Sequence, residues 1–274
     1  MHRAGWTVVA LTALVPSAGM PRPDEPATVS PPGEVTRASL PPWLELEVGL
    51  EMGRHDWRVE GLQPGAELRA YTLPLFEAMR VRVGLYPLRS ASGVFQRLGI
   101  ELWGTGAFPA SLKNPSDNVD YPVGQYELGA VARLGLRVAP WLVLAPAGGI
   151  SKFHSQVQPA RSGAVPVGFP PVDLLTARAG MSLDGTFPPF GVRVELTSLF
   201  LLPGGPLFQP PYFPAAQGTF SFEAVARLAL TLTEPLVISL EARFVQIGID
   251  LQDPRATAAS ARTFVGGLSL RYSG

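Results

Sequence analysis

The sequence lacks the residues on which many kinds of functional site depend. Its 274 residues include no cysteine and only three histidines. Without cysteine there is no disulfide, thiolate metal site, thiol nucleophile or lipid anchor on an N-terminal cysteine. The 22 Lys and Arg residues balance the 22 Asp and Glu residues without any basic run, so nucleic acid is not an expected partner.

Signatures of enzymes and of long helices are missing too. There is no Gly-x-Ser-x-Gly elbow, His-Glu-x-x-His pair or phosphate loop. No catalytic residue, cofactor or metal is therefore expected, and the chain is not expected to be an enzyme. Glycine and proline, 29 of each, make up about a fifth of the chain. Both residues destabilise helix interiors, which favours an all-β protein.

The N-terminal segment has the composition of a targeting signal. A weakly basic start is followed by an apolar stretch over residues 4–15 and by small residues up to Gly19. This order predicts a signal peptide over residues 1–19, because an apolar run of about a dozen residues is too short to cross a bilayer. Residues 20–42 carry seven prolines among polar residues, which predicts a disordered linker.

From residue 43 to residue 274 the sequence alternates between apolar and polar residues. In the segment from Leu44 to Met52 the even positions are apolar and three of the odd ones are glutamate. A period of two indicates a strand with one apolar and one polar face. A bulge or break is expected at Pro146, which cannot donate to a ladder. The predicted strands are 44–60, 77–87, 97–109, 121–138, 141–156, 172–184, 190–202, 218–233, 236–251 and 263–273.

Strand length and connection length favour a membrane barrel over a soluble sandwich. Most segments reach the roughly 9–11 residues that a tilted transmembrane strand needs. Short and long connections alternate, as in bacterial outer-membrane barrels. The short ones are 88–96, 139–140, 185–189 and 234–235, and the long ones are 61–76, 110–120, 157–171, 203–217 and 252–262. A secreted β-sandwich, with the two faces reversed, is the water-soluble alternative.

Aromatic residues gather near the predicted strand ends, where a lipid interface would lie. At the short-turn ends these are Trp43, Tyr86, Trp141, Phe190 and Tyr272; near the long-loop ends they are Trp57, Phe76, Phe108, Tyr121, Phe153, Phe200 and Phe220. The fold expected from all these features is a closed, antiparallel, up-and-down transmembrane β-barrel of about ten strands, and eight to twelve would be compatible with the pattern.

In these features the segment 43–274 resembles the small outer-membrane β-barrel proteins of Gram-negative bacteria, OmpA/OmpX-like in the loose sense. Its end, from Phe264 to Tyr272, is similar to the terminal strand that the outer-membrane assembly machinery reads, although two residues follow the aromatic here. The resemblance implies an outer-membrane location with both termini in the periplasm. It also implies contact with outer-membrane lipid and lipopolysaccharide, and loops available to an extracellular protein or glycan ligand.

Charged side chains on the polar face are expected to point into the lumen, because an arginine on the lipid face costs roughly 2–4 kcal/mol at the midplane. Paired as Arg–carboxylate forks they would fill a barrel of this size. This predicted ion-pair network consists of Glu45, Glu47, Glu51, Arg80, Arg82, Glu101, Glu127, Arg133, Arg137, Arg178, Arg193, Glu195, Glu223, Arg227, Glu241, Arg243 and Arg271.

A balanced lumen predicts a plug, since a selective channel would show an excess of one sign. The expected function is structural or surface-binding, through long extracellular loops. One alternative is a narrow channel or transporter for small solutes. Another is an enzyme at the rim that uses His55, Asp56 and His154. Two Pro-rich loops, around 208–214 and 165–171, either engage a surface partner or fold over the barrel mouth.

Overall fold

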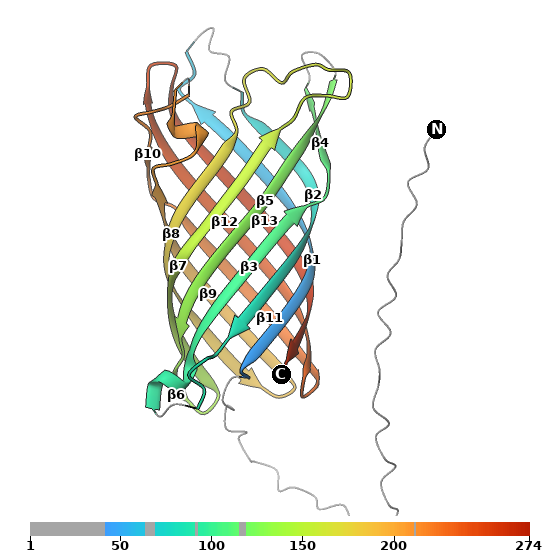
Figure 1. The fold of residues 1–274 in the computed structure, drawn as a ribbon, viewed down its shortest axis with the longest axis vertical. Coiled ribbons are helices and arrows are strands. Elements are labelled where there is room, and N and C mark those ends of the chain that lie inside the picture. Colours follow the sequence, from blue (N-terminus) through green and yellow to red (C-terminus); the bar gives the residue numbers. More distant parts are fainter. Residues whose placement is uncertain (1–41, 64–68, 91–92, 115–118, 211) are drawn as a thin grey trace, which may run out of the picture. The chain divides into compact units, whose positions relative to one another are not determined.

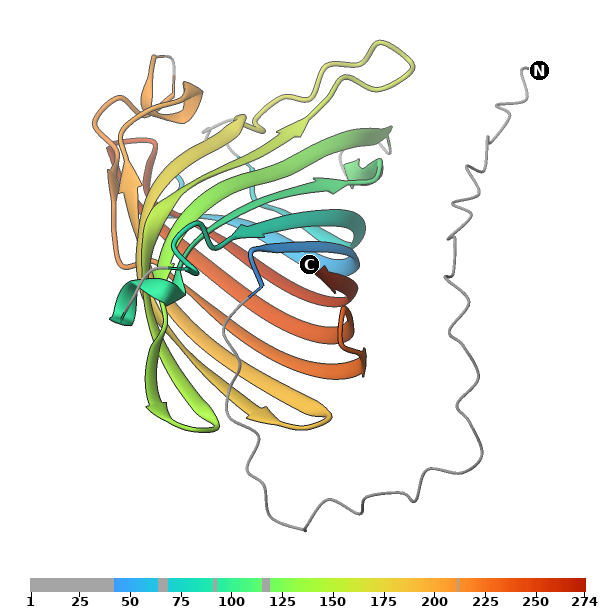
Figure 2. The same cartoon turned by 60° about the horizontal axis from the view of Figure 1, so that its bottom comes forward.

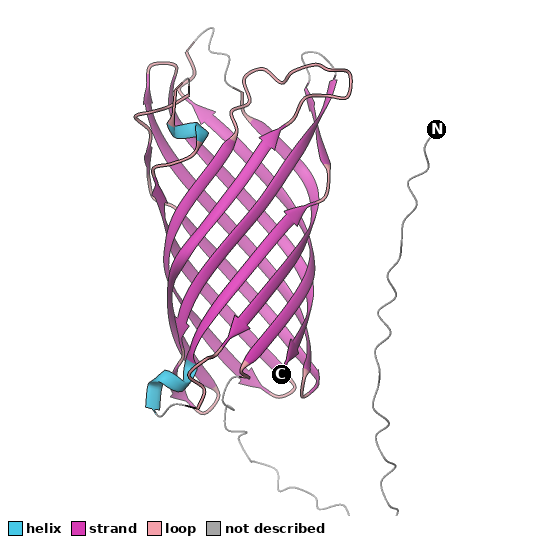
Figure 3. Cartoon of the chain, viewed as in Figure 1, coloured by secondary structure: helices cyan, strands magenta, loops and turns pink. Residues whose placement is uncertain are grey.

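The computed structural model describes residues 42–63, 69–90, 93–114, 119–210 and 212–274. The predicted signal peptide, and the predicted linker up to residue 41, lie outside these ranges. Within them, no helix has both the length and the apolar character needed to cross a membrane. Strands account for most of the described residues, with two short 3-10 helices (Figure 3).

The strands run up and down the molecule in chain order (Figure 1). Three crossings are each made of two pieces, β3 with β4, β5 with β6 and β10 with β11, so the chain crosses ten times. The elements are β1 (Leu44–Glu60), β2 (Tyr71–Leu85), η1 (Gly93–Arg97), β3 (Leu98–Ala107), β4 (Ala110–Asn114), β5 (Val119–Leu134), β6 (Leu136–Ala139), β7 (Leu142–Val157), β8 (Val172–Phe187), β9 (Phe190–Leu202), η2 (Pro206–Phe208), β10 (Gln217–Gly218), β11 (Phe222–Thr233), β12 (Leu236–Asp253) and β13 (Ala256–Ser273).

The sheet closes on itself, as Figure 2 shows from the short-turn end. Every pairing is antiparallel between chain neighbours, and β5 pairs with β7 beyond the short β6 hairpin. The first and last strands pair from Glu45↔Ser273 to Glu60↔Ala258. Closure leaves no free strand edge in the part of the wall that an apolar belt surrounds, which is the condition for a sheet to stand in lipid. Above it, β4 pairs with β5 and the first residues of β2 pair with β1. The expected all-β, up-and-down barrel of ten strands is confirmed.

An apolar belt surrounds the outside of the barrel. On β1, Leu46, Val48, Leu50 and Met52 all point outward and are between 43% and 64% exposed. The other strands contribute at the same level, for example Leu240 on β12 and Leu268 on β13, which lie opposite one another. Nine or ten residues of each strand suffice to cross the hydrocarbon layer, so the 17 residues of β1 reach well beyond the belt.

Above the belt, toward the long-loop end, the two faces exchange character. The outward positions of β1 continue as Arg54, Asp56, Arg58 and Glu60, while Trp57 on its inward face is only 1% exposed. On β12 the inward face changes from charged to apolar after Arg243, with Ile247, Ile249 and Leu251 buried. The barrel therefore has a lipid-facing lower part with a charged lumen and an upper part with an apolar lumen.

Several local predictions are wrong. β2 begins at Tyr71, within the expected loop 61–76, and β4 lies within the expected loop 110–120. β7 is continuous through Pro146, and the break lies in its partner, between β5 and β6 at Gly135, whose amide donates to the Arg97 carbonyl. The partner strand ends where proline offers no N–H. The expected loop 252–262 is mostly paired strand, because β12 and β13 are joined by Pro254 and Arg255 alone. Small inward residues such as Ala259 had hidden that alternation.

The expected aromatic girdle at the long-loop end is also largely wrong. Phe108, Phe200 and Phe220 are exposed, but Trp57, Phe76, Tyr121 and Phe153 lie on the inward face. At the short-turn end, Trp43, Trp141, Phe190 and Tyr272 are exposed, between 41% and 58%. Tyr86 instead points inward, where its ring covers Gly99 at 2.7 Å from the position of a Cβ. It has the parity of Arg82 and Gly84, the lumen face of β2.

Candidate functional site

The charged lumen of the lower barrel is the candidate site. The predicted network residues on β1, β2, β3, β5, β8, β9, β11, β12 and β13 make ion pairs with one another or with Asp184 across the interior. Arg137, on β6, lies exposed near the short-turn end and outside the lumen. Its strand is the short hairpin piece that protrudes below the closed wall.

The upper layer of the lumen is a compact cluster of two arginines and two glutamates. Arg243, on β12, donates to both carboxylates: its Nε lies 3.0 Å from Glu223 Oε2, and its Nη1 lies 2.7 Å from Glu127 Oε2. Arg178, on β8, donates to the second oxygen of Glu223. The cluster is neutral and deeply buried, with side-chain exposures of 4–12%. Such bidentate forks hold four strands in a fixed arrangement.

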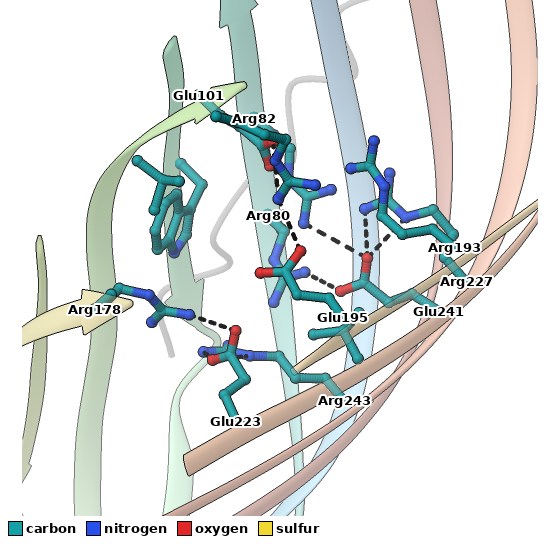
Figure 4. A pocket seen from close by; sticks show the side chains of 14 residues that line it. Arg80, Arg82, Glu101, Arg178, Arg193, Glu195, Glu223, Arg227, Glu241 and Arg243 are labelled. Carbon is teal, nitrogen blue, oxygen red and sulfur yellow. Dashed lines mark hydrogen bonds and ion pairs between the residues drawn. The ribbon is translucent and has the colours of Figure 1, made fainter. Parts of the chain in front are cut away.

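The middle layer links a longer chain of charges (Figure 4). Glu241, on β12, accepts from Arg80 and Arg227. Arg227 continues to Glu47 at 2.8 Å, and Arg80 continues to Glu51 at 2.8 Å. These contacts join β1, β2, β11 and β12 across the interior, so the wall is cross-linked by side chains as well as by its backbone ladder.

The layer nearest the short-turn end is looser. Arg82 contacts Glu101 at 3.0 Å but reaches Glu47 and Glu241 only at 3.6 and 3.5 Å. Arg133 lies 2.7 Å from Glu195 and 3.7 Å from Glu101. Below it, Arg271 and Glu45 are 3.5 Å apart. Exposure rises along this direction, from 6% for the Arg80 side chain to 23% for that of Arg271.

Two residues of the site were missed by the sequence reading. Asp184 pairs with Arg193, and it shares the parity of Arg178 and Ser182, so the pattern of β8 already pointed it inward. With Asp184, and without the exposed Arg137, the lumen set has nine carboxylates for eight arginines. Trp103 lies 5.1 Å from the Arg178 guanidinium in a cation–π contact. Its indole covers Gly129, where a Cβ would lie 2.0 Å away, so only glycine fits there.

These side chains leave little open space. The cavity among them measures about 40 Å³, which is room for about three water molecules at ~10–15 Å³ each. Seven arginines, four glutamates, Trp103, Val131 and Val225 line it. The charged side chains thus fill most of the lumen and leave one small cavity, with room for about three water molecules.

Comparison with known proteins finds similar structures but no similar sequence. Neither a family model nor a curated protein sequence matches the chain. The solved structures that match it include the following three. The outer-membrane protease OmpT of Escherichia coli is 9% identical, with 84% of this chain and 96% of that one covered and a TM-score of 0.49. Ail of Yersinia pestis, in complex with a heparin analogue, is 10% identical, with 84% and 99% covered and a TM-score of 0.35. Neisserial surface protein A is 11% identical, with 84% and 97% covered and a TM-score of 0.33.

What decides the class is the placement of polarity. The lower barrel is apolar toward its surroundings and charged inside, and its closed wall leaves no backbone edge unpaired. The chain is a small β-barrel of the bacterial outer-membrane type. The water-soluble sandwich, with its faces reversed, does not describe it.

The upper lumen of this outer-membrane barrel is a packed apolar core. Side chains from nine of its crossing strands meet there, including Trp57, Leu73, Leu174 and Ile249, each at most 1% exposed. The segment between β9 and β11 folds in over them and buries Leu207 and Phe213. Of the two outcomes expected for this loop, covering the mouth is the one observed.

The three rim candidates do not form a common site in the barrel. His55 points inward and is fully buried, with its Nδ1 2.9 Å from Thr263 Oγ1. Asp56, the next residue, points outward, where Arg54 and Thr72 donate to it. His154 also points outward, stacked on Tyr126 and 3.8 Å from Asp173. Neighbouring residues of a strand face opposite sides, which is why the sequence proximity of His55 and Asp56 misled.

No metal site is evident in the described part of the chain either. Among those residues no group of three or more His, Asp or Glu side chains is arranged to hold an ion. The carboxylates of the lumen are instead occupied by guanidiniums.

Proposed function

We propose that this protein is a non-conducting outer-membrane barrel with a structural or surface-binding role. The proposal rests on the two layers of side chains that fill the lumen. Ion pairs fill the lipid-facing part, and an apolar core fills the part above it. An ion or solute would have to displace buried Arg–Glu pairs and then cross a dry apolar layer. Both steps are costly, so the narrow-channel alternative is disfavoured.

The upper barrel then acts as a rigid support for loops outside the cell. The loop between β7 and β8 carries Val165 and Val167, which are 67% and 53% exposed. This loop is held by the connection between β1 and β2, since the Arg69 amide donates to the Gly168 carbonyl at 2.8 Å. Exposed apolar side chains on a supported loop suit an extracellular protein or glycan ligand. Lipopolysaccharide would surround the belt, and β13 would present the terminal strand to the assembly machinery.

Bilayer recording tests whether the barrel conducts. Purified protein reconstituted in planar bilayers should give no stepwise current, because ion pairs fill the lower lumen and apolar side chains fill the upper one. A porin prepared in the same detergent is the positive control for insertion. Reproducible steps of one size, absent when protein is omitted, would contradict the proposal and support a channel.

The orientation can be tested separately, because a chain without cysteine gives no labelling background. We expect Val165→Cys to react on intact cells with a maleimide that cannot cross the outer membrane. Glu234→Cys, at the exposed β11–β12 turn of the opposite end, should react only after the membrane is opened. The reverse pattern would place the short turns outside and overturn the proposed periplasmic position of both termini.

A further inference from the structure

The lumen holds one more carboxylate than arginine, yet it has more hydrogen-bond donors than acceptors. A guanidinium carries five N–H donors, whereas a carboxylate offers about four acceptor sites. The imbalance is greatest around the cavity, which is lined by seven arginines and four glutamates. The remaining carboxylates, Asp184 among them, lie outside the cavity wall. Donors therefore face the cavity in excess.

Particular donors in this wall have no protein partner. Arg133 and Arg178 are at least nine-tenths buried, yet the Nε of each donates to no described protein atom. Arg193 donates to Asp184 through its Nε. A buried donor of a charged group without an acceptor is costly, so an acceptor in the cavity would be strongly favoured.

Glu101 is the shared carboxylate of this region. Arg82 lies 3.0 Å from it, Arg133 lies 3.7 Å from it, and Arg193 also acts on it electrostatically. Glu101 is thus shared by three guanidiniums. Arg133 and Arg193 each have one other close carboxylate, and the other carboxylates near Arg82 are 3.5–3.6 Å away. Figure 4 shows Glu101 beside Arg82, with Arg193 near Arg227.

Access to the cavity is from the short-turn end. The side chains of Arg82, Glu101 and Arg193 are 16–20% exposed, whereas Arg178 and Arg80, deeper in the lumen, are 4–6% exposed. Above them the apolar core closes the barrel. The wall separates the cavity from lipid, so a lipid headgroup does not reach it. A solute in the compartment on the short-turn side can reach the cavity.

From this arrangement we propose that the lumen cavity binds one small inorganic oxyanion, of the sulfate or phosphate class, between Arg82, Arg133 and Arg193. Planar guanidiniums bind the oxygens of such ions in pairs, and all three of these guanidiniums line the cavity. The small volume of the cavity excludes a larger metabolite. The anion site is then open to the short-turn side and closed above by the apolar core.

Calorimetric titration of the detergent-purified barrel with sodium sulfate, and separately with sodium phosphate, tests the proposal. The background salt is sodium gluconate, whose anion is too large for the cavity. We expect saturable binding of about one ion per chain. Arg193→Gln should weaken binding roughly tenfold, because a positive charge at contact distance is lost. Arg58→Gln removes the same charge from the exposed outward face and should leave binding unchanged.

A change in the opposite direction separates a site from general loss of structure. Glu101→Gln removes the carboxylate that competes for the three guanidiniums, and Asp184→Asn releases Arg193. Each should strengthen binding roughly tenfold. Glu60→Gln, above the belt, is the matched control. Each variant must show the heat-dependent gel shift of a folded barrel. Absence of saturable binding, or equal binding in all the lumen variants, would mean that water satisfies these donors and would overturn the proposal.

Discussion

Replacing Arg243 by methionine should lower the free energy of unfolding by about 3–5 kcal/mol, the usual cost of removing one partner of a buried ion pair. Arg243 donates to Glu127 and to Glu223, with contacts of 2.6–3.0 Å. Methionine fills part of the space but leaves the two carboxylates with Arg178 as their only close cation. The measurement is urea unfolding in lipid vesicles, followed by tryptophan fluorescence.

A second substitution distinguishes charge imbalance from lost packing. Arg243→Met combined with Glu127→Gln restores neutrality and keeps the Arg178–Glu223 pair. We expect it to recover at least half of the loss. Arg58→Met, on the exposed outward face, should change stability by no more than about 0.5 kcal/mol. If the double variant were no more stable than the single one, packing around the arginine stem would be the cause.

The fold was readable from the sequence because a barrel strand alternates over its whole length. The charges of Glu47, Arg80 and Arg227 fix the inward parity of β1, β2 and β11. What one strand cannot reveal is which charge meets which across the lumen. Arg227 and Glu47 are 180 residues apart, and their 2.8 Å contact depends on the register of every strand between them.

The exchange of faces above the belt was present in the sequence and was overlooked. On β12 the inward series passes from Glu241 and Arg243 to Ile247 and Ile249, while Asp250 appears on the outward face. Assigning one polar face and one apolar face to the whole strand hides this change of character. Reading each strand in two halves would have predicted the apolar upper core, and with it the inward position of Trp57. The burial of Leu207 by a loop has no periodic signal.

This upper core makes the second large effect predictable. Replacing Trp57 by alanine should cost about 3–5 kcal/mol, because a large side chain that is 1% exposed leaves a cavity its neighbours cannot fill. The damage should be local to the upper barrel. The ion-pair layers lie below and keep their contacts, so the heat-dependent gel shift should persist. Amide exchange on the upper halves of β1 and β13 should accelerate.

The matched control is Trp43→Ala, which removes the same side chain from a position that is 58% exposed at the short-turn end. It should change stability by about 0.5 kcal/mol or less. Trp103 and Trp141 remain in both variants to report unfolding. Equal losses from the two single variants would refute the packed upper core. A loss confined to Trp57→Ala, with faster exchange only above the belt, would establish that the barrel is stabilised in two layers: charge within the membrane and apolar packing beyond it.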